Sequence, residues 1–149
     1  MLIPQKLESV YQLLRATLGV LTVTTGLDKF VGLLADWRFY LAPELRRIVG
    51  EGAVGVVATA GVIELLIGVA LLSGATRAFG YVLCGWFVVT ACNLVVGGWY
   101  DLALRDLALA ASAFSLARLA SARREPLPAI DRAPPTRAPR QARRVATTR

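Results

Sequence analysis

The chain has 149 residues, enough for one domain, and 56% of them are hydrophobic. Soluble domains contain about 45–50% apolar residues, and the mean hydropathy of this chain, +0.56, is correspondingly high. The composition excludes a disordered chain, a collagen-like chain and a disulfide scaffold, and it argues against an ordinary soluble enzyme. The sequence contains no His, so it lacks the commonest general base and the commonest metal ligand.

The net charge of +7 is distributed unevenly along the chain. Residues 121–149 contain eight Arg against one Glu and one Asp, a net charge of +6, so residues 1–120 carry only +1. Five of the seven prolines also lie in this segment, at 126–139. We therefore expect residues 121–149 to be a disordered, Arg/Pro-rich tail rather than part of a nucleic-acid-binding fold.

Four apolar segments, at 12–34, 53–72, 79–97 and 102–120, are expected to form transmembrane helices. As helices of about 19–23 residues they measure about 28–35 Å, which matches a hydrocarbon core about 30 Å thick. Helices are the default because a backbone in lipid must satisfy its own hydrogen bonds. The predicted fold is therefore an all-α, polytopic, four-helix membrane bundle over residues 1–120. The alternative is a soluble bundle of very apolar helices.

The segment 35–52 is the longest connection between the predicted helices, and its aromatic residues are typical of a membrane interface. Pro43 is expected to open a short interfacial helix, because proline is tolerated in a first helical turn. The Arg-rich tail and Arg77 outweigh the basic residues of this connection, so the positive-inside rule predicts that both termini are cytoplasmic. Arg outnumbers Lys 15 to 2, as in high-GC bacteria, and the expected location is a bacterial inner membrane.

Charged and amide side chains inside the predicted spans are the candidate functional residues. A charge in a membrane costs about 2.5–3.5 kcal/mol and usually faces the bundle interior. The candidates for a ligand or proton site are Glu64, Arg15, Asp28, Lys29, Asn93, Arg105 and Asp106. Apart from Glu64 and Arg15, we expect them to gather with Asp101 near the outer ends of the helices. Glu64 is expected to stand nearly alone near mid-membrane, where it either pairs with a long side chain such as Arg15 or stays protonated.

Small and polar residues recur at helical spacing in each predicted span and mark the face expected to point inward. They are Arg15, Gly19, Thr22, Gly26 and Lys29 in the first span, Gly61, Glu64 and Gly68 in the second, Trp86, Thr90, Asn93 and Gly97 in the third, and Asp101, Arg105, Ala108, Ser112 and Ser115 in the fourth. Such residues allow helices to approach closely in membranes. The buried charges have two open interpretations: ion pairs that hold the bundle together, or a site for a ligand, a proton or a quinone.

The two cysteines do not suggest a redox pair. Cys84 and Cys92 lie eight residues apart on one predicted helix, a separation of about 12 Å, whereas a disulfide needs Cα atoms closer than about 7 Å. The chain has no CxxC motif and no GxGxxG flavin fingerprint. We expect both cysteines to be small packing residues, and we expect no metal site and no intrinsic cofactor.

Several short motifs follow one another in a distinctive order. They are Arg15-x-x-x-Gly19, Gly26-Leu27-Asp28-Lys29-Phe30, a Trp and a Tyr before Pro43, Glu64-Leu65-Leu66-Ile67-Gly68, and Tyr100-Asp101-Leu102-Ala103-Leu104-Arg105-Asp106-Leu107. Over residues 10–120 this order resembles the DoxX-like family of small four-helix integral membrane proteins. Some members are subunits of thiosulfate:quinone oxidoreductases, and others are linked to oxidative-stress and thiol-redox assemblies. The resemblance implies that Arg15, Lys29, Glu64, Arg105 and Asp106 occupy the family's polar positions.

Three functions follow as expectations. The resemblance implies an accessory subunit of a membrane redox or quinone-linked assembly, with a redox complex as partner, a bound quinone as cofactor and no self-contained catalytic centre. The buried charges suggest instead a bundle that binds or moves a small ligand, a lipid or a proton through Glu64. The basic tail suggests a membrane scaffold that binds anionic lipid headgroups.

Overall fold

The computed structural model describes residues 2–123, and over this range the chain is helical and contains no strand. The four long helices are α1 (Leu2–Val31), α3 (Ala53–Leu72), α4 (Thr76–Val96) and α5 (Tyr100–Ala122). The connection between α1 and α3 contains three short helices, η1 (Trp37–Tyr40), α2 (Pro43–Val49) and η2 (Gly50–Gly52). The all-α prediction is confirmed, while residues 124–149 of the predicted tail lie outside the described residues.

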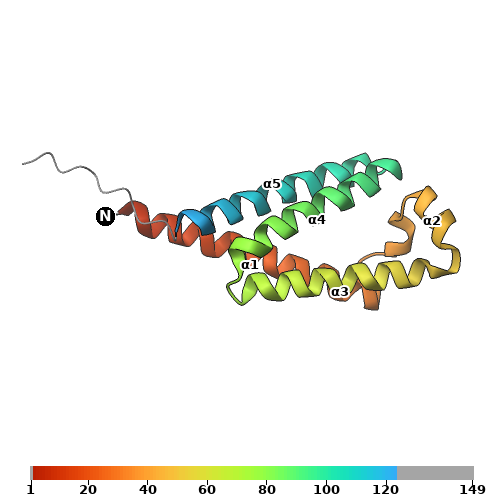
Figure 1. Cartoon of the computed structure of the whole chain (residues 1–149), viewed down its shortest axis with the longest axis horizontal. Coiled ribbons are helices and arrows are strands. Elements are labelled where there is room, and N and C mark those ends of the chain that lie inside the picture. The colour runs from red at the N-terminus through yellow and green to blue at the C-terminus, as the bar shows by residue number, and fades with distance from the viewer. Residues whose placement is uncertain (1, 124–149) are drawn as a thin grey trace, which may run out of the picture.

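The long helices form two antiparallel pairs, α1 with α3 and α4 with α5 (Figure 1). The pairs meet at the end of the molecule where α1 begins and α5 ends, and they diverge toward the other end, where α2 lies (Figure 1). An ion pair between Arg123 and Glu8, with Nη2 and Oε2 2.6 Å apart, links the two ends of the described chain. Both ends therefore lie on the same side of the helical body.

The helix α1 begins ten residues before the predicted start at residue 12. Its first three turns are too polar to belong to an apolar run, but polar side chains do not oppose helix formation. Gln12 donates a hydrogen bond to the Glu8 carboxylate one turn earlier, at 2.8 Å, a spacing that stabilises a helix. The helix is thus extended by residues that a hydropathy pattern leaves out.

The end of α1 and the short helix α2 have clear local causes. Gly32 has a φ of +65° and lies just beyond Val31, in the left-handed conformation that commonly ends a helix. This glycine ends α1 three residues before the predicted boundary at 34. Pro43 occupies the first turn of α2, as expected from its fixed φ and missing N–H.

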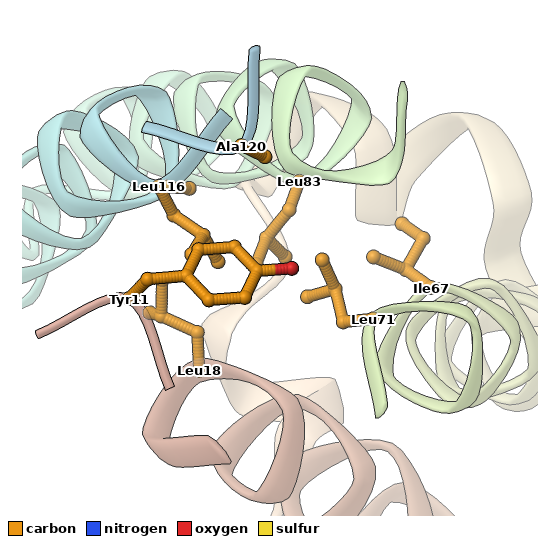
Figure 2. Packing of buried hydrophobic residues seen from close by; sticks show 8 residues of the cluster. Tyr11, Leu18, Ile67, Leu71, Leu83, Leu116 and Ala120 are labelled. Carbon is orange, nitrogen blue, oxygen red and sulfur yellow. The ribbon is translucent and has the colours of Figure 1, made fainter. Parts of the chain in front are cut away.

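An apolar core lies where the two helix pairs meet. Figure 2 shows Leu18 of α1, Leu71 of α3, Leu83 of α4 and Leu116 of α5 close together in this core. Tyr11 lies in the same cluster, and its hydroxyl donates to the Thr76 hydroxyl at 2.9 Å. This bond pairs a polar atom that would otherwise be desolvated without a partner.

The surface of the described chain is rich in large apolar side chains. Leu13, Leu66, Val89 and Leu104, one from each long helix, are all more than half exposed. Two helices are long and apolar enough to cross a membrane, namely Thr76–Val96 and the continuous segment Pro43–Leu72. The helices α1 and α5, which carry more polar residues, are not among them. Length and composition thus give two candidate spans.

Candidate functional site: a buried polar cluster around Glu64

Glycines bring α1 and α3 into close contact. A Cβ atom built on Gly26 would lie 3.0 Å from the backbone oxygen of Gly61, and one built on Gly68 would lie 3.1 Å from that of Gly19. On each helix the two glycines are seven residues apart, so the same faces meet along about two turns. This contact confirms the inward faces predicted for the first two spans, and it brings α1 side chains within reach of Glu64.

Glu64 is the centre of a buried polar cluster. Its Oε2 accepts hydrogen bonds from Lys29 Nζ at 2.7 Å and from Thr25 Oγ1 at 3.1 Å, and its Oε1 accepts one from Trp86 Nε1 at 3.0 Å. The Lys29 and Glu64 side chains are each 8% exposed. Because the donors come from α1 and α4 and the acceptor from α3, one carboxylate joins three helices by charge-assisted and neutral hydrogen bonds.

The structure corrects the prediction that Glu64 stands nearly alone or pairs with Arg15. Its ionic partner is Lys29, which was expected to lie with the outer group. The depth of Lys29 was predicted only from the rise per residue along the helix. Helical side chains lean toward the helix N-terminus, so the long Lys29 side chain reaches back along α1 to Glu64. Arg15 donates instead to the backbone oxygen of Leu72 at 3.1 Å, a carbonyl at the end of α3 without a helical partner.

Asp28 and Trp37 extend the cluster into the connection after α1. The Asp28 carboxylate accepts backbone N–H hydrogen bonds from residues 33–35, at 2.8, 2.8 and 3.3 Å, and one from Trp37 Nε1 at 2.7 Å. The ring of Trp37 also lies 3.9 Å from Lys29 Nζ, a favourable cation–π distance. Trp37 therefore contacts both charged residues at the end of α1.

Asn93 of α4 holds the middle of the same connection, between η1 and α2. Its Nδ2 donates to the backbone oxygen of Tyr40 at 2.7 Å, and its Oδ1 accepts from the backbone N–H of Ala42 at 2.9 Å. Nearby, the Arg38 guanidinium donates to both oxygens of Asp36 and holds the pKa of this carboxyl below its usual value. Asn93 has a positioning role, because both polar ends of its amide are occupied by backbone.

Asp106 of α5 is a second buried carboxylate. Its Oδ1 accepts from Arg105 Nε and Nη2 at 3.1 and 3.0 Å, and its Oδ2 accepts from Thr90 Oγ1 at 2.9 Å. The Asp106 side chain is 8% exposed, whereas that of Arg105 is 55% exposed. The ion pair is formed within α5, and only Thr90 connects this carboxylate to another helix.

The predicted outer cluster is divided into three groups. Asp28 and Lys29 belong with Glu64, Asn93 with the connection, and Asp106 with Arg105. Within the part of the chain that the structure describes, no direct hydrogen bond or ion pair joins Asn93, or the Arg105–Asp106 pair, to Glu64, Lys29 or Asp28. The prediction grouped residues that lie at the same depth along their helices. The two helix pairs diverge at this end of the molecule, so residues at the same depth lie on separate pairs (Figure 1).

The inward face predicted for the fourth span is wrong. Ser112 and Ser115 donate to backbone oxygens one turn earlier, each at 2.9 Å, so their hydroxyls need no partner on another helix. The face of α5 that packs against α4 is formed by alanines. Ala103, Ala110, Ala113 and Ala117 are all buried.

Four residues of these groups were not among the candidates: Thr25, Trp37, Trp86 and Thr90. Trp86 and Thr90 lie on the face predicted to point inward from the third span, so their spacing could have identified them. Trp37 lies in a connection with no helical period, and its contacts depend on how the chain turns after α1. Thr25 precedes Gly26 of the face predicted for the first span, and nothing in the sequence distinguishes it from the other threonines of that span.

The chemistry available to these groups is limited. Among residues 2–123, no group of three or more His, Cys, Asp or Glu side chains is placed to hold a metal ion. Cys84 packs against the core, and Cys92 is exposed rather than packed; both thiols are free. In the described chain every buried side-chain nitrogen or oxygen has a hydrogen-bond partner. The cluster around Glu64 can hold charge and a proton, and its polar atoms are already paired.

Comparison with known proteins identifies no relative: no family model, curated protein or solved structure matches the chain. The contacts of the polar groups and the distribution of apolar side chains are therefore the basis for a functional assignment.

Proposed function

We propose that all four long helices cross a lipid bilayer and that the chain is a membrane-embedded accessory subunit without a catalytic centre of its own. The observation that carries this proposal is an inverted distribution of polarity. Glu64 and Asp106 are buried, whereas large side chains such as Leu66 and Leu104 project outward. In water this arrangement would expose extensive apolar surface. In lipid it is expected, because charged groups turn inward and apolar groups face acyl chains.

The proposed setting is a bacterial inner membrane with both ends of the chain in the cytoplasm. Helices α1 and α5 have their free ends on the same side of the bundle (Figure 1), as an even number of spans requires. The Arg-rich segment after α5 supplies the positive charge that remains cytoplasmic under the positive-inside rule. Both inferences depend on α1 and α5 crossing the bilayer.

Cysteine labelling distinguishes four spans from two. In a chain with Cys84 and Cys92 replaced by Ser, single cysteines would be placed at Lys6, Asp36 and Ala75. A membrane-impermeant maleimide should then find Lys6 and Ala75 on one side and Asp36 on the other. If only α3 and α4 cross, Lys6 would instead label together with Asp36, and the four-span proposal would fail.

The accessory role is proposed from the DoxX-like motifs together with the ion pairs. The resemblance assigns Lys29, Glu64, Arg105 and Asp106 to the family's polar positions. Lys29 and Glu64 form an ion pair that joins α1 to α3, and Arg105 and Asp106 form one within α5. The described residues do not fit a quinone at Glu64, because Lys29, Thr25 and Trp86 already donate to that carboxylate. The redox partner, rather than this chain, would then carry the cofactor.

Purification in nanodiscs, followed by mass spectrometry of copurified proteins and of organic extracts, tests the accessory role. We expect a stoichiometric redox protein to copurify with the native chain. Recovery of a folded chain with no partner protein would contradict the proposal. A quinone that copurifies without a partner protein would show that the chain itself holds the cofactor.

A second candidate function is a bundle that moves a proton through the buried ion pair of Glu64 and Lys29. The observation that favours it is the convergence of three donors from two helices on one buried carboxylate. Proton flux into liposomes containing the chain should then be abolished by Glu64→Gln and retained by Asp106→Asn. Equal flux in both variants would exclude this function.

A further inference from the structure

An open groove lies between the first turns of α1 and the last turns of α5, on the outside of the bundle. It is a shallow feature, widely open to its surroundings, with a volume of about 530 Å³. Its walls are mainly apolar, formed by Leu7, Val10, Leu14, Phe114, Leu119 and Ala122. The polar side chains lining it are Ser115 and Arg118.

Arg118 gives the groove a charge. Among residues 2–123 it has no hydrogen-bond or ion-pair partner. Arg123, which follows the same helix, pairs instead with Glu8 at 2.6 Å. Glu8 is the only acidic residue in residues 1–27, and this pair neutralises it. The charge of Arg118 is therefore uncompensated beside an apolar groove.

The position of Arg118 along α5 suits the edge of a bilayer. It lies four residues before Ala122, the last residue of the helix, so it is about 6 Å below the helix end. A long arginine side chain at that depth reaches the headgroup level, while its stem stays among apolar groups. The groove would extend from this level into the acyl-chain region.

We propose that this groove binds one anionic phospholipid of the membrane, with an acyl chain along the apolar walls and the phosphate on the Arg118 guanidinium. The ligand class follows from charge complementarity: a guanidinium is a strong partner for phosphate, and the Glu8 carboxylate is paired with Arg123. The segment after Arg123 adds seven Arg against two acidic residues, which concentrates anionic lipid at the same side. The inference rests on the proposed membrane setting.

Native mass spectrometry of the full chain tests the proposal. The protein would be released from nanodiscs that contain equal amounts of phosphatidylglycerol and phosphatidylcholine with identical acyl chains. We expect one phosphatidylglycerol to be retained, and Arg118→Gln to reduce its preference over phosphatidylcholine about fivefold. Arg77→Gln removes a charge at the same end but outside the groove, and it should leave the preference unchanged.

Two further variants separate the groove from general charge attraction. Ala122→Trp fills the groove without altering charge and should release the lipid, whereas Ala111→Trp, on the same helix outside the groove, should not. Equal losses in Arg118→Gln and Arg77→Gln would overturn the proposal, as would retention by Ala122→Trp. Stronger binding after removal of residues 124–149 would show that the tail occupies the groove and would also overturn it. A chain that does not enter nanodiscs contradicts the membrane setting itself.

Discussion

The α1/α3 pair and the α4/α5 pair each bury a carboxylate, but they neutralise it differently. In the first pair, Glu64 of α3 meets Lys29 of α1, and both side chains are almost completely buried. In the second pair, Asp106 meets Arg105, its neighbour in sequence, whose side chain is half exposed. One ion pair connects helices, and the other remains within one helix.

The close packing of the two pairs differs in the same way. Backbone meets backbone between α1 and α3, where Gly26 and Gly61 face each other. Between α4 and α5 a glycine faces an alanine: a Cβ built on Gly80 would lie 2.9 Å from the Ala117 Cβ and 3.2 Å from the Ala117 backbone nitrogen. The comparison indicates that the first pair needs both its glycines and its ion pair, because a wider separation would part Lys29 from Glu64. The second pair tolerates a small separation, since its ion pair would stay intact.

The largest effect is expected from Lys29→Met, which leaves the Glu64 carboxylate buried without a counter-charge. Removing one partner of a buried pair costs about 3–5 kcal/mol. We expect a loss of this size in the free energy of unfolding measured by detergent titration. A smaller loss is expected for Arg105→Met, because Arg105 is half exposed and pairs within α5, so its removal breaks no contact between helices. The double variant Lys29→Met/Glu64→Met should recover most of the loss. Equal losses in the two single variants would remove the distinction between the helix pairs.

The next effect concerns the glycine contact. A side chain on Gly26 would collide with the Gly61 backbone oxygen, which lies 3.0 Å from the Cβ position, and overpacking costs about 1–3 kcal/mol. Gly26→Leu should therefore lower the thermal midpoint in detergent. Gly85 has no atom within 4 Å of its Cβ position, so Gly85→Leu should leave the midpoint unchanged. A similar fall in both would mean that close packing at Gly26 does not decide the result, because leucine has a higher helix propensity than glycine at either position.

A smaller and local effect is expected for Asn93→Ala. This change removes two hydrogen bonds to the connection, at Tyr40 and Ala42, and costs about 1–2 kcal/mol. Hydrogen exchange should become faster at the Ala42 amide and remain unchanged in α3. Cys92→Ala, at the adjacent exposed position, serves as the control. Unchanged exchange at Ala42 would show that Asn93 does not hold the connection.

The smallest effect is a change of pKa at Asp36. The hydrogen bonds from Arg38 lower the pKa of this carboxyl below its ordinary value of 3.8. Its contribution to folding is therefore present above that value and is lost as the pH falls through the lowered pKa. In Arg38→Gln, a carbon-13 NMR titration should show the pKa of Asp36 returning toward 3.8, with stability at pH 7 nearly unchanged. Arg46→Gln should not alter the titration, and a shift there would indicate a general charge effect.

Part of this architecture is visible in the sequence because it depends on local pattern. The bounds of α3 coincide with its apolar run at 53–72, and the spacing of the α1 glycines identifies the face that contacts α3. Glu64, Lys29 and Asp28 are buried, as expected for charged residues in these helices, but the prediction that Glu64 lies apart from the other two is wrong. The helical spacing of glycines and the tendency of charged residues to face the interior of a membrane bundle are sufficient to predict these features.

The remainder depends on contacts between distant segments. The partner of Glu64 is decided by the register of two antiparallel helices and by the direction in which the Lys29 side chain leans. The face of α5 that packs against α4 could not be identified from the positions of polar residues. The serines of α5 form hydrogen bonds within their own helix, and the buried positions are mostly alanines. Trp37 enters the cluster only through the turn after Gly32, where no period exists to indicate it.

Two of the tryptophans lie against the buried ion pair of Lys29 and Glu64, so their fluorescence depends on the state of that pair. Trp86 donates to the Glu64 carboxylate, and the Trp37 ring lies against the Lys29 ammonium, so each indole is next to one half of the buried ion pair. Trp99, the third indole of the chain, packs against Tyr40 and Phe39 instead. Intrinsic fluorescence of the unlabelled protein will therefore respond to separation of that pair through two emitters, with a third as an internal reference.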